Sequence, residues 1–365
     1  MMTLKADINT PMYERELELI KAIYNSEEFR MPVRYVCILT NDCNLRCPFC
    51  YMEKVPTDRQ MLLNDWLSLL EQLPDYARVI LMGGEPLFYK DFEQVYRAAA
   101  SRFPCTIVTN GTLLSKKMVE ILLSERGLYE LCVSIEMIGN HNRGFTQKQW
   151  DRLVEGLKYY VYLKKRVNPH ARLGITTIFL DENAHQLFDL YRFCREELGC
   201  DNVTYNPLNG TPMQLRDSMG SFEELYSREK AEGIYYRNWE VIKKQLEKIR
   251  QYDFERGIRS TYIRPKLMNF YSDESFDRLD IINSASGHDY EYGRCKYPWS
   301  DCRIYGDGNV SSCLAYSFGN FKETPDLTAI LTGERAMRFK RVIREEGFFP
   351  QCYRCVFQYL KEYER

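Results

Sequence analysis

The chain carries three closely spaced cysteines, Cys43, Cys47 and Cys50, directly after an apolar segment. That segment, residues 33–39, is rich in β-branched and aromatic side chains, which predicts a strand. Thiolates suit the irons of an iron–sulfur cluster, which normally takes four cysteine ligands. A [4Fe–4S] cluster held by these three alone would keep one iron open for a ligand outside the protein. A structural zinc loop and three unrelated thiols are the alternatives.

Three later strand-like segments end in short turns of glycine and polar residues. The segment 78–82 leads into Gly83-Gly84-Glu85-Pro86, 105–108 into Thr109-Asn110-Gly111, and 129–133 into Ser134-Ile135-Glu136. Because glycine has no Cβ atom, it lets the backbone approach a ligand closely. Each turn therefore could line a binding site.

Segments with helical periodicity separate these strands and continue beyond them. Helices are predicted at 61–73, 92–103, 115–123, 148–164 and 184–198, and further strands at 173–180 and 202–205. Strands that alternate with helices over short connections form right-handed βαβ units and a parallel sheet. We therefore predict an α/β fold, a partial (β/α)6 barrel of the TIM type. In such barrels the reactive groups lie at the carboxyl ends of the strands, so the cysteine loop and the three turns should meet at one rim.

The cysteine loop, with its Cys-x3-Cys-x2-Cys spacing, and the three turns together resemble the radical S-adenosylmethionine (SAM) superfamily. The resemblance implies a [4Fe–4S] cluster on Cys43, Cys47 and Cys50 whose open iron binds the amino and carboxylate groups of SAM. It also implies that reductive cleavage of SAM yields a 5′-deoxyadenosyl radical. Gly83, Gly84 and Glu85 would then lie against the SAM amino group. Thr109 and Asn110 match a Thr-Asn-Gly sequence that is common in this family.

The same resemblance assigns SAM contacts after the fourth strand. Ser134 and Glu136 match a Ser-x-Asp pair that contacts the SAM ribose or carboxylate, with Glu in place of Asp. Arg143, in a shortened form of a downstream motif, is the candidate partner of the SAM carboxylate through bidentate pairing. Phe49 is expected to cover the cluster or the adenine edge.

A second group of cysteines lies near the carboxyl end of the sequence. Cys295 and Cys313 enclose Asp307-Gly308-Asn309, a hairpin signal, and Cys352 and Cys355 form a Cys-x2-Cys pair. Four thiolates brought together in this way suit either zinc or an iron–sulfur cluster. The spacing resembles the SPASM/twitch extension of radical SAM enzymes, which implies one auxiliary [4Fe–4S] cluster with all four positions filled.

Cys302 lies between the members of this second group without a clear ligand spacing. It could be an alternative ligand, or a hydrogen-atom donor if the reaction is an epimerisation, but a small buried residue beside a strand is the plainer interpretation. The other cysteines lie in or beside predicted strands and helices, where buried apolar thiols are expected: Cys37, Cys105, Cys132, Cys194 and Cys200.

Composition narrows the class of protein. Lys and Arg number 50 against 51 Asp and Glu, and no basic stretch alternates with aromatics, so we expect no nucleic-acid partner. We find no apolar stretch of about 18 residues and no signal peptide, which predicts a cytoplasmic protein without a membrane partner. Thirteen cysteines in such a chain indicate reduced thiols and metal ligation.

The predicted organisation has four parts. Residues 1–30 hold a short amphipathic helix at 12–24, and 31–208 form the barrel. Residues 209–290 form a helical bridge with a long helix at 223–252. Residues 291–365 form a small α+β cluster-binding extension with a β-hairpin.

Three functions remain open. The resemblance favours a radical SAM oxidoreductase that abstracts hydrogen from a small hydroxylated metabolite (a sugar, an aminocyclitol or a nucleoside), assisted by the auxiliary cluster and by an external donor such as flavodoxin or ferredoxin. The first alternative is a peptide or protein maturase that forms a side-chain cross-link, an epimer or a formylglycine. The second is a non-catalytic iron–sulfur or zinc protein that carries electrons or acts as a sensor.

Overall fold

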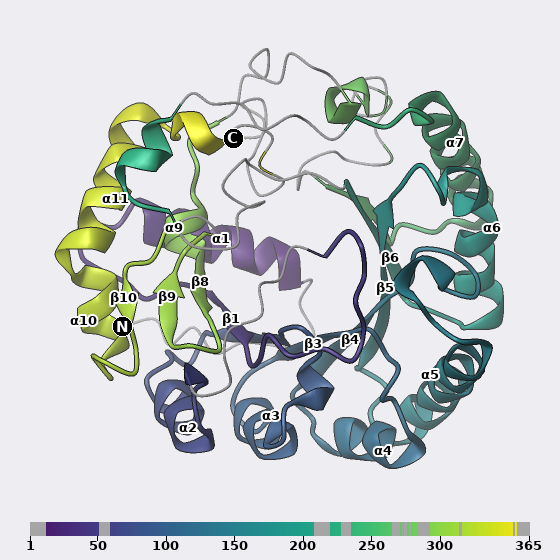
Figure 1. Cartoon of the computed structure of the whole chain (residues 1–365), viewed down its shortest axis with the longest axis horizontal. Coiled ribbons are helices and arrows are strands. Elements are labelled where there is room, and N and C mark those ends of the chain that lie inside the picture. Colours follow the sequence, from purple (N-terminus) through teal and green to yellow (C-terminus); the bar gives the residue numbers. More distant parts are fainter. Residues whose placement is uncertain are drawn as a thin grey trace.

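One sheet organises the chain (Figure 1). The computed structural model describes residues 12–50, 59–207, 220–227, 235–264, 271, 273, 276, 279–283, 293–313, 316–352 and 355. Within these ranges the sheet has ten strands in the order β10-β9-β8-β1-β2-β3-β4-β5-β6-β7. The strands are β1 Arg34–Ile38, β2 Arg78–Met82, β3 Cys105–Thr109, β4 Leu128–Ser134, β5 Arg172–Phe179, β6 Asn202–Pro207, β7 Thr261–Ile263, β8 Asp301–Ile304, β9 Asn309–Ser311 and β10 Gly319–Asn320.

Most of the helices form an outer ring around this sheet, whereas α1 lies inside that ring in the view of Figure 1. The helices are α1 Met12–Tyr24, α2 Leu63–Glu71, α3 Phe92–Ala100, α4 Lys116–Ser124, α5 Gln147–Val167, α6 Leu187–Arg192, α7 Trp239–Arg256, α9 Tyr297–Ser300, α10 Leu327–Thr332 and α11 Glu334–Glu346. Strands β1 to β6 are neighbours in chain order and pair in parallel. The described sheet is open, with β10 and β7 at its two ends. This confirms the predicted α/β fold with a partial barrel.

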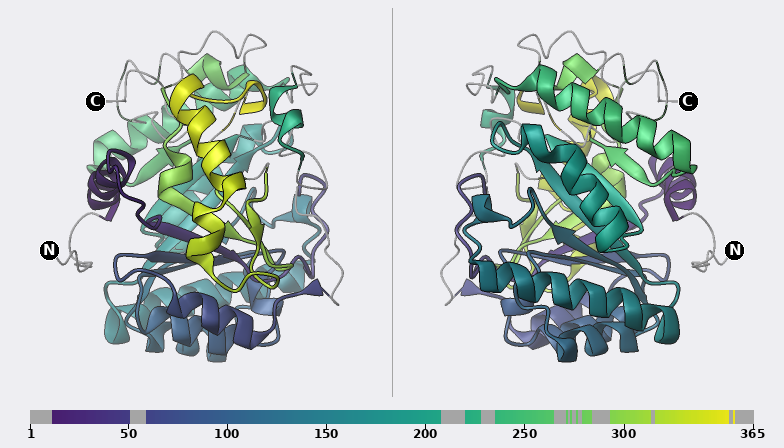
Figure 2. Two further views of the ribbon diagram at one scale, coloured as in Figure 1. Left: turned by 90° about the vertical axis from the view of Figure 1, so that its left-hand side faces the viewer. Right: turned by 90° about the vertical axis from the view of Figure 1, so that its right-hand side faces the viewer.

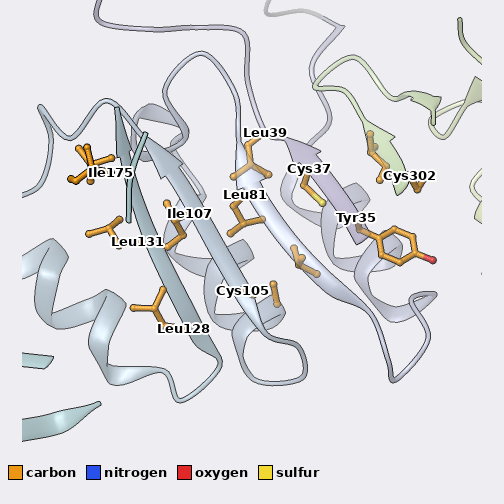
Figure 3. Close-up of a cluster of buried hydrophobic side chains, with 14 of the residues drawn as sticks. Tyr35, Cys37, Leu39, Leu81, Cys105, Ile107, Leu128, Leu131, Ile175 and Cys302 are labelled. Carbon is orange, nitrogen blue, oxygen red and sulfur yellow. The ribbon is translucent and has the colours of Figure 1, made fainter. Parts of the chain in front are cut away.

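The two faces of the sheet differ in exposure. Side chains that face the helices are buried together with helix residues such as Trp66 and Leu153, and Figure 3 shows several of them, including Tyr35, Leu81 and Ile107. Alternate residues on the inner face of β2 to β6 are partly exposed: Ile80, Met82, Val108, Glu130, Cys132, Ser134, Thr176, Ile178, Thr204 and Asn206. The expectation that Cys132 is a buried apolar thiol was therefore wrong, because it lies on this inner face.

The predicted β-hairpin continues the main sheet. Strands β8 and β9 pair antiparallel around Gly308, whose φ of 89° suits a residue without a Cβ atom. Strand β8 also pairs in parallel with β1, and β7 pairs in parallel with β6. Sequence analysis did not predict β7 or the β1–β8 pairing. The four predicted domain boundaries stay predictions.

Helix α1 has the predicted bounds and is fixed to the amino ends of two strands. The Glu16 carboxylate accepts a hydrogen bond from Arg78 at 2.9 Å and lies 3.8 Å from the Arg34 guanidinium. In Figure 2, α1 lies on the side of the molecule away from the loop that follows β1. Within the described ranges, none of the helices is long and apolar enough to cross a membrane.

The prediction of one long helix at 223–252 was wrong. The described part of this segment has a single 3-10 turn at Glu223–Tyr226, and α7 begins at Trp239. The backbone N–H groups of Arg237 and Asn238 donate to the carboxylate of Asp181 at 3.2 and 2.9 Å. Because these donors are satisfied from outside, the helix starts only after them.

Candidate active site

The three cysteines of the first group lie on the irregular segment that follows β1. The Cys50 N–H donates to the Cys47 carbonyl oxygen at 3.1 Å, which closes a tight turn between them. The Leu45 N–H donates to the Cys43 sulfur at 3.4 Å. Burial raises the pKa values of Cys43 and Cys47, and the nearby Cys50 thiol raises both further. The three thiols are therefore close enough to act on one another.

The glycine pair after β2 packs directly on the start of the cysteine loop. A Cβ atom on Gly83 would lie 2.4 Å from the Thr40 carbonyl oxygen, and one on Gly84 would lie 2.4 Å from that of Asp42. The Gly84 N–H donates to Thr40 at 2.7 Å, and the Glu85 N–H donates to Asp42 at 2.9 Å. Glycine is required here because backbone meets backbone. The turn after β2 thereby fixes the segment that leads to Cys43.

The side chain of Glu85 is completely buried and joins the ends of β2 and β3. It accepts hydrogen bonds from the Thr109 hydroxyl at 2.6 Å, the Asn110 N–H at 2.7 Å and the Leu87 N–H at 3.1 Å. Burial raises the pKa of Glu85 to about 7 in spite of these bonds. The Asn110 amide in turn donates to the Cys43 sulfur at 3.7 Å. A buried carboxylate thus positions a donor on the first cysteine.

Arg143 connects the end of β4 to the cysteine loop. Its Nε and Nη2 atoms donate to the two carboxylate oxygens of Glu136, and its Nη1 atom donates to the Cys47 sulfur at 3.4 Å. The guanidinium carbon lies 5.2 Å from the centroid of the Phe49 ring. Ser134 ends β4 and is partly exposed on the inner face. The structure thus gathers Glu136, Arg143 and Phe49 around Cys47.

Charge and burial act in opposite directions on this pair. Burial disfavours the Arg143 cation, but Glu136 and Cys47 outweigh it, so the pKa of Arg143 lies above its ordinary value. The Glu136 side chain is 0% exposed, whereas that of Arg143 is 12% exposed. The SAM contacts assigned to Ser134, Glu136, Arg143 and Phe49 stay predictions.

The second group of cysteines also converges. Burial raises the pKa values of Cys295 and Cys352, and Cys355 and Cys313 raise both further. The Cys355 N–H donates to the Cys352 carbonyl oxygen at 3.1 Å, the same turn as in the first group. Four thiols from three separate segments therefore lie near one another. Sequence spacing and resemblance predicted this set, and its role as the ligands of one auxiliary cluster stays a prediction.

Cys302 lies on the other face of the sheet. It is in register with Tyr35 on β1, is 0% exposed and belongs to the core beneath the outer helices. Its neighbour Lys340 on α11 is also buried, and burial lowers the pKa of Lys340 to about 8. The role of Cys302 as a ligand or hydrogen donor stays a prediction, which this position does not favour.

Two protein-family models match the segments that contain the two groups of cysteines. The model of the radical SAM superfamily matches residues 37–194, and that of the SPASM iron–sulfur cluster-binding domain matches residues 295–356. The chain belongs to the radical SAM superfamily. The second match identifies a SPASM extension, and the cofactors of this radical SAM protein are SAM and [4Fe–4S] clusters.

Individual relatives differ in what they act on. The chain is 27% identical over 336 residues to the tungsten-containing aldehyde ferredoxin oxidoreductase cofactor-modifying protein of Pyrococcus furiosus, covering 87% of this chain and 85% of that protein. It is 31% identical over 169 residues to the sporulation killing factor maturation protein SkfB of Bacillus subtilis, covering 45% and 40%.

A solved structure shares the fold. SuiB of Streptococcus suis bound to S-adenosylmethionine superposes with a TM-score of 0.60 at 18% identity, covering 93% of this chain and 73% of SuiB. SuiB bound to its precursor peptide SuiA gives the same TM-score at 19% identity, covering 90% and 70%.

The donors around the thiols fit an iron–sulfur cluster. Asn110 and Arg143 direct N–H groups at the sulfurs of Cys43 and Cys47, and such bonds stabilise thiolate ligands. Among the residues that the structure describes, no three His, Cys, Asp or Glu side chains stand as ligands of one ion.

Sequence analysis missed the pairing of Glu136 with Arg143. The chain returns between them through Gly139 and Asn140, which have φ values of 84° and 52°, and Gly144, directly after Arg143, has a φ of 79°. Glycine and asparagine are the residues that favour such turns, so this cluster of turn residues was the available signal.

Gly84→Ala should displace the cysteine loop. The added Cβ atom would lie 2.4 Å from the Asp42 carbonyl oxygen and 2.6 Å from that of Asn41, and backbone cannot move aside as a flexible side chain can. We expect the iron held by the first group to fall from about four per chain towards zero, with the second group unaffected. Iron and sulfide assays after anaerobic reconstitution measure this.

Gly257→Ala is the matched control for Gly84→Ala. Gly257 ends α7 with a φ of 65° and has open space around it, so only backbone strain is added. We expect a loss of about 1 kcal/mol of stability and unchanged iron. Full iron content in Gly84→Ala would contradict the close-packing argument.

Glu85→Gln should destabilise the metal-free protein most at low pH. The glutamine amide cannot accept from every donor that Glu85 serves, which costs about 1–3 kcal/mol. The wild-type protein loses stability as the pH rises from about 4.5 to about 7, because its folded state keeps the Glu85 proton longer than the unfolded chain does. The variant lacks this loss, so the difference in unfolding free energy between wild type and variant should narrow between about pH 4.5 and pH 7. Urea unfolding at several pH values measures it, and a constant difference would contradict the raised pKa.

Proposed function

We propose that this protein cleaves SAM at a [4Fe–4S] cluster on Cys43, Cys47 and Cys50 and abstracts a hydrogen atom from a substrate carbon. The cluster and SAM, when bound, supply the 5′-deoxyadenosyl radical. The observation that carries the proposal is the joining of the cysteine loop to the ends of β2, β3 and β4 through Gly84, Glu85 and Arg143. An electron carrier would not need this rim.

The described side chains have capacity left to bind SAM. A guanidinium has five N–H donors, and three of those on Arg143 are used by Glu136 and Cys47. The remaining two, one on each Nη atom, are left to donate to the SAM carboxylate. Gly83, Gly84, Thr109, Asn110 and Ser134 lie at the same rim and keep their proposed roles beside SAM.

We propose that the inner face of the sheet receives a small polar molecule. Side chains there are partly exposed, and the set includes both charged and amide groups. Glu130 accepts a hydrogen bond from Asn202 at 2.8 Å, and Asn206 donates to Thr176 at 2.6 Å. Such groups suit a hydroxylated metabolite. One relative that aligns over 87% of this chain and 85% of its own length is a cofactor-modifying protein, which also supports a small-molecule substrate.

The second group of thiols suits an oxidative reaction. If Cys295, Cys313, Cys352 and Cys355 all bind one auxiliary [4Fe–4S] cluster, no iron is open for substrate, and electron transfer is the role that remains. Abstraction of a hydrogen atom followed by loss of a proton leaves one electron on the substrate. An external donor such as flavodoxin or ferredoxin would supply the electron that starts the cycle.

Peptide maturation is the second candidate. SkfB is a maturation protein, and SuiB, which shares the fold, has been solved with a precursor peptide. The two candidates share the cleavage of SAM and differ in their substrate and in the change made to it. A mass change in a peptide after incubation with enzyme, SAM and reductant would select the second, and turnover of a free hydroxylated metabolite would select the first.

Variants of the two cysteine groups test the shared mechanism. Cys47→Ala should abolish formation of 5′-deoxyadenosine from SAM and dithionite, because the first cluster loses a ligand. Cys355→Ala should keep uncoupled 5′-deoxyadenosine formation and lose product. Cys194→Ala, which alters a buried core thiol, is the control and should keep both. Full product formation by Cys355→Ala would refute the redox role of the second group, and absence of SAM cleavage by the wild-type protein would refute the enzyme class.

A further inference from the structure

The side chain of Glu136 is buried, and both of its backbone hydrogen-bonding groups are paired with side chains. Its side chain is 0% exposed beneath Arg143, and its N–H donates to the Asn140 side-chain oxygen at 3.0 Å. Its carbonyl oxygen accepts from the Asn183 amide at 2.9 Å. Asn140 adopts a φ of 52°, a conformation that asparagine tolerates better than most residues. Hydrogen bonds at both its N–H and its carbonyl oxygen therefore fix the backbone of Glu136, and with it the position of the carboxylate.

This fixed carboxylate determines where Arg143 points. Two parallel hydrogen bonds from Nε and Nη2 hold the guanidinium plane, as is usual for an Arg–carboxylate pair. The plane then extends to the Cys47 sulfur at 3.4 Å and lies over Phe49. A positive charge and a hydrogen-bond donor are therefore aimed at one of the three thiols.

We propose that Glu136 is a positioning residue that holds Arg143 on the Cys47 thiolate, and that this pair raises the reduction potential of the first cluster. The inference rests on the proposed function, since it requires a cluster on Cys43, Cys47 and Cys50. It gives Glu136 a role through Arg143 instead of a contact with the SAM ribose.

The direction of the effect follows from charge. Reduction adds one negative charge to the cluster, and a nearby cation with a hydrogen bond to a ligand sulfur stabilises that state. The negative charge of Glu136 opposes this, but it lies behind the guanidinium, which stands between it and Cys47. The net effect of the pair is therefore set by Arg143.

Potentiometric titration followed by electron paramagnetic resonance, without SAM, tests the proposal. Omitting SAM keeps any change in SAM affinity out of the result. We expect Arg143→Gln to shift the midpoint potential of the first cluster to more negative values. Glu136→Asp keeps both charges but shortens the carboxylate arm, so it should shift the potential in the same direction by less. The second cluster is the internal standard, and its midpoint potential should not change.

Two further variants complete the design. Arg97→Gln removes an arginine that is paired with Glu93 and Glu125 away from the cysteines, and it should leave both potentials unchanged. Arg143→Lys keeps the positive charge but loses the bidentate hydrogen bonding of the guanidinium. We therefore expect a smaller negative shift than in Arg143→Gln. This variant decides the question if Arg143→Gln fails to assemble the cluster.

The outcomes separate this inference from the proposed function. An unchanged or more positive potential in Arg143→Gln, or in Arg143→Lys where that variant decides, would overturn the inference. A shift in Arg143→Gln with none in Glu136→Asp would overturn the positioning role of Glu136. A wild-type protein without iron at the first group, or without SAM cleavage, would instead refute the proposed function.

Discussion

The buried side chain of Glu85 is the contact on which the candidate site depends. A carboxylate without water is costly unless its oxygens are satisfied, and here they accept from the Thr109 hydroxyl and from the N–H groups of Asn110 and Leu87. The backbone of the same turn is bonded to Thr40 and Asp42. One residue thereby fixes the ends of β2 and β3 and the start of the cysteine loop relative to one another.

Glu136 repeats this arrangement two strands farther along the sheet, after β4. Glu85 positions Asn110, which donates to Cys43, and Glu136 positions Arg143, which donates to Cys47. A neutral donor serves the first sulfur and a charged donor the second. Cys50 is exposed, so the cysteine loop has one side tied to the barrel and one side open to solvent. A cluster bound here would be held rigidly on the side that faces the sheet.

The strands and the turns at their carboxyl ends were largely predictable from the sequence, because the local signals for them agreed with one another. β-Branched runs predicted β1 to β6 closely, and the turn residues after them predicted the rim. The second cysteine group was predicted from spacing and resemblance. Long-range contacts were not predictable in this way. The pairing of β8 with β1 and the late start of α7 each depend on a partner distant in the chain, such as Asp181 for α7. The Glu136–Arg143 pair was missed because resemblance assigned each residue to SAM separately.

Iron and sulfide content after anaerobic reconstitution tests the central claim most directly, that two separate groups of thiols each hold a cluster. The wild-type protein should bind about eight irons per chain. Replacement of Cys43, Cys47 and Cys50 together by Ala should leave about four and abolish SAM cleavage, and replacement of Cys295, Cys313, Cys352 and Cys355 should leave about four with SAM cleavage intact. About four irons in the wild-type protein, unchanged when the second group is replaced, would contradict the claim and leave the second group to zinc or to no metal.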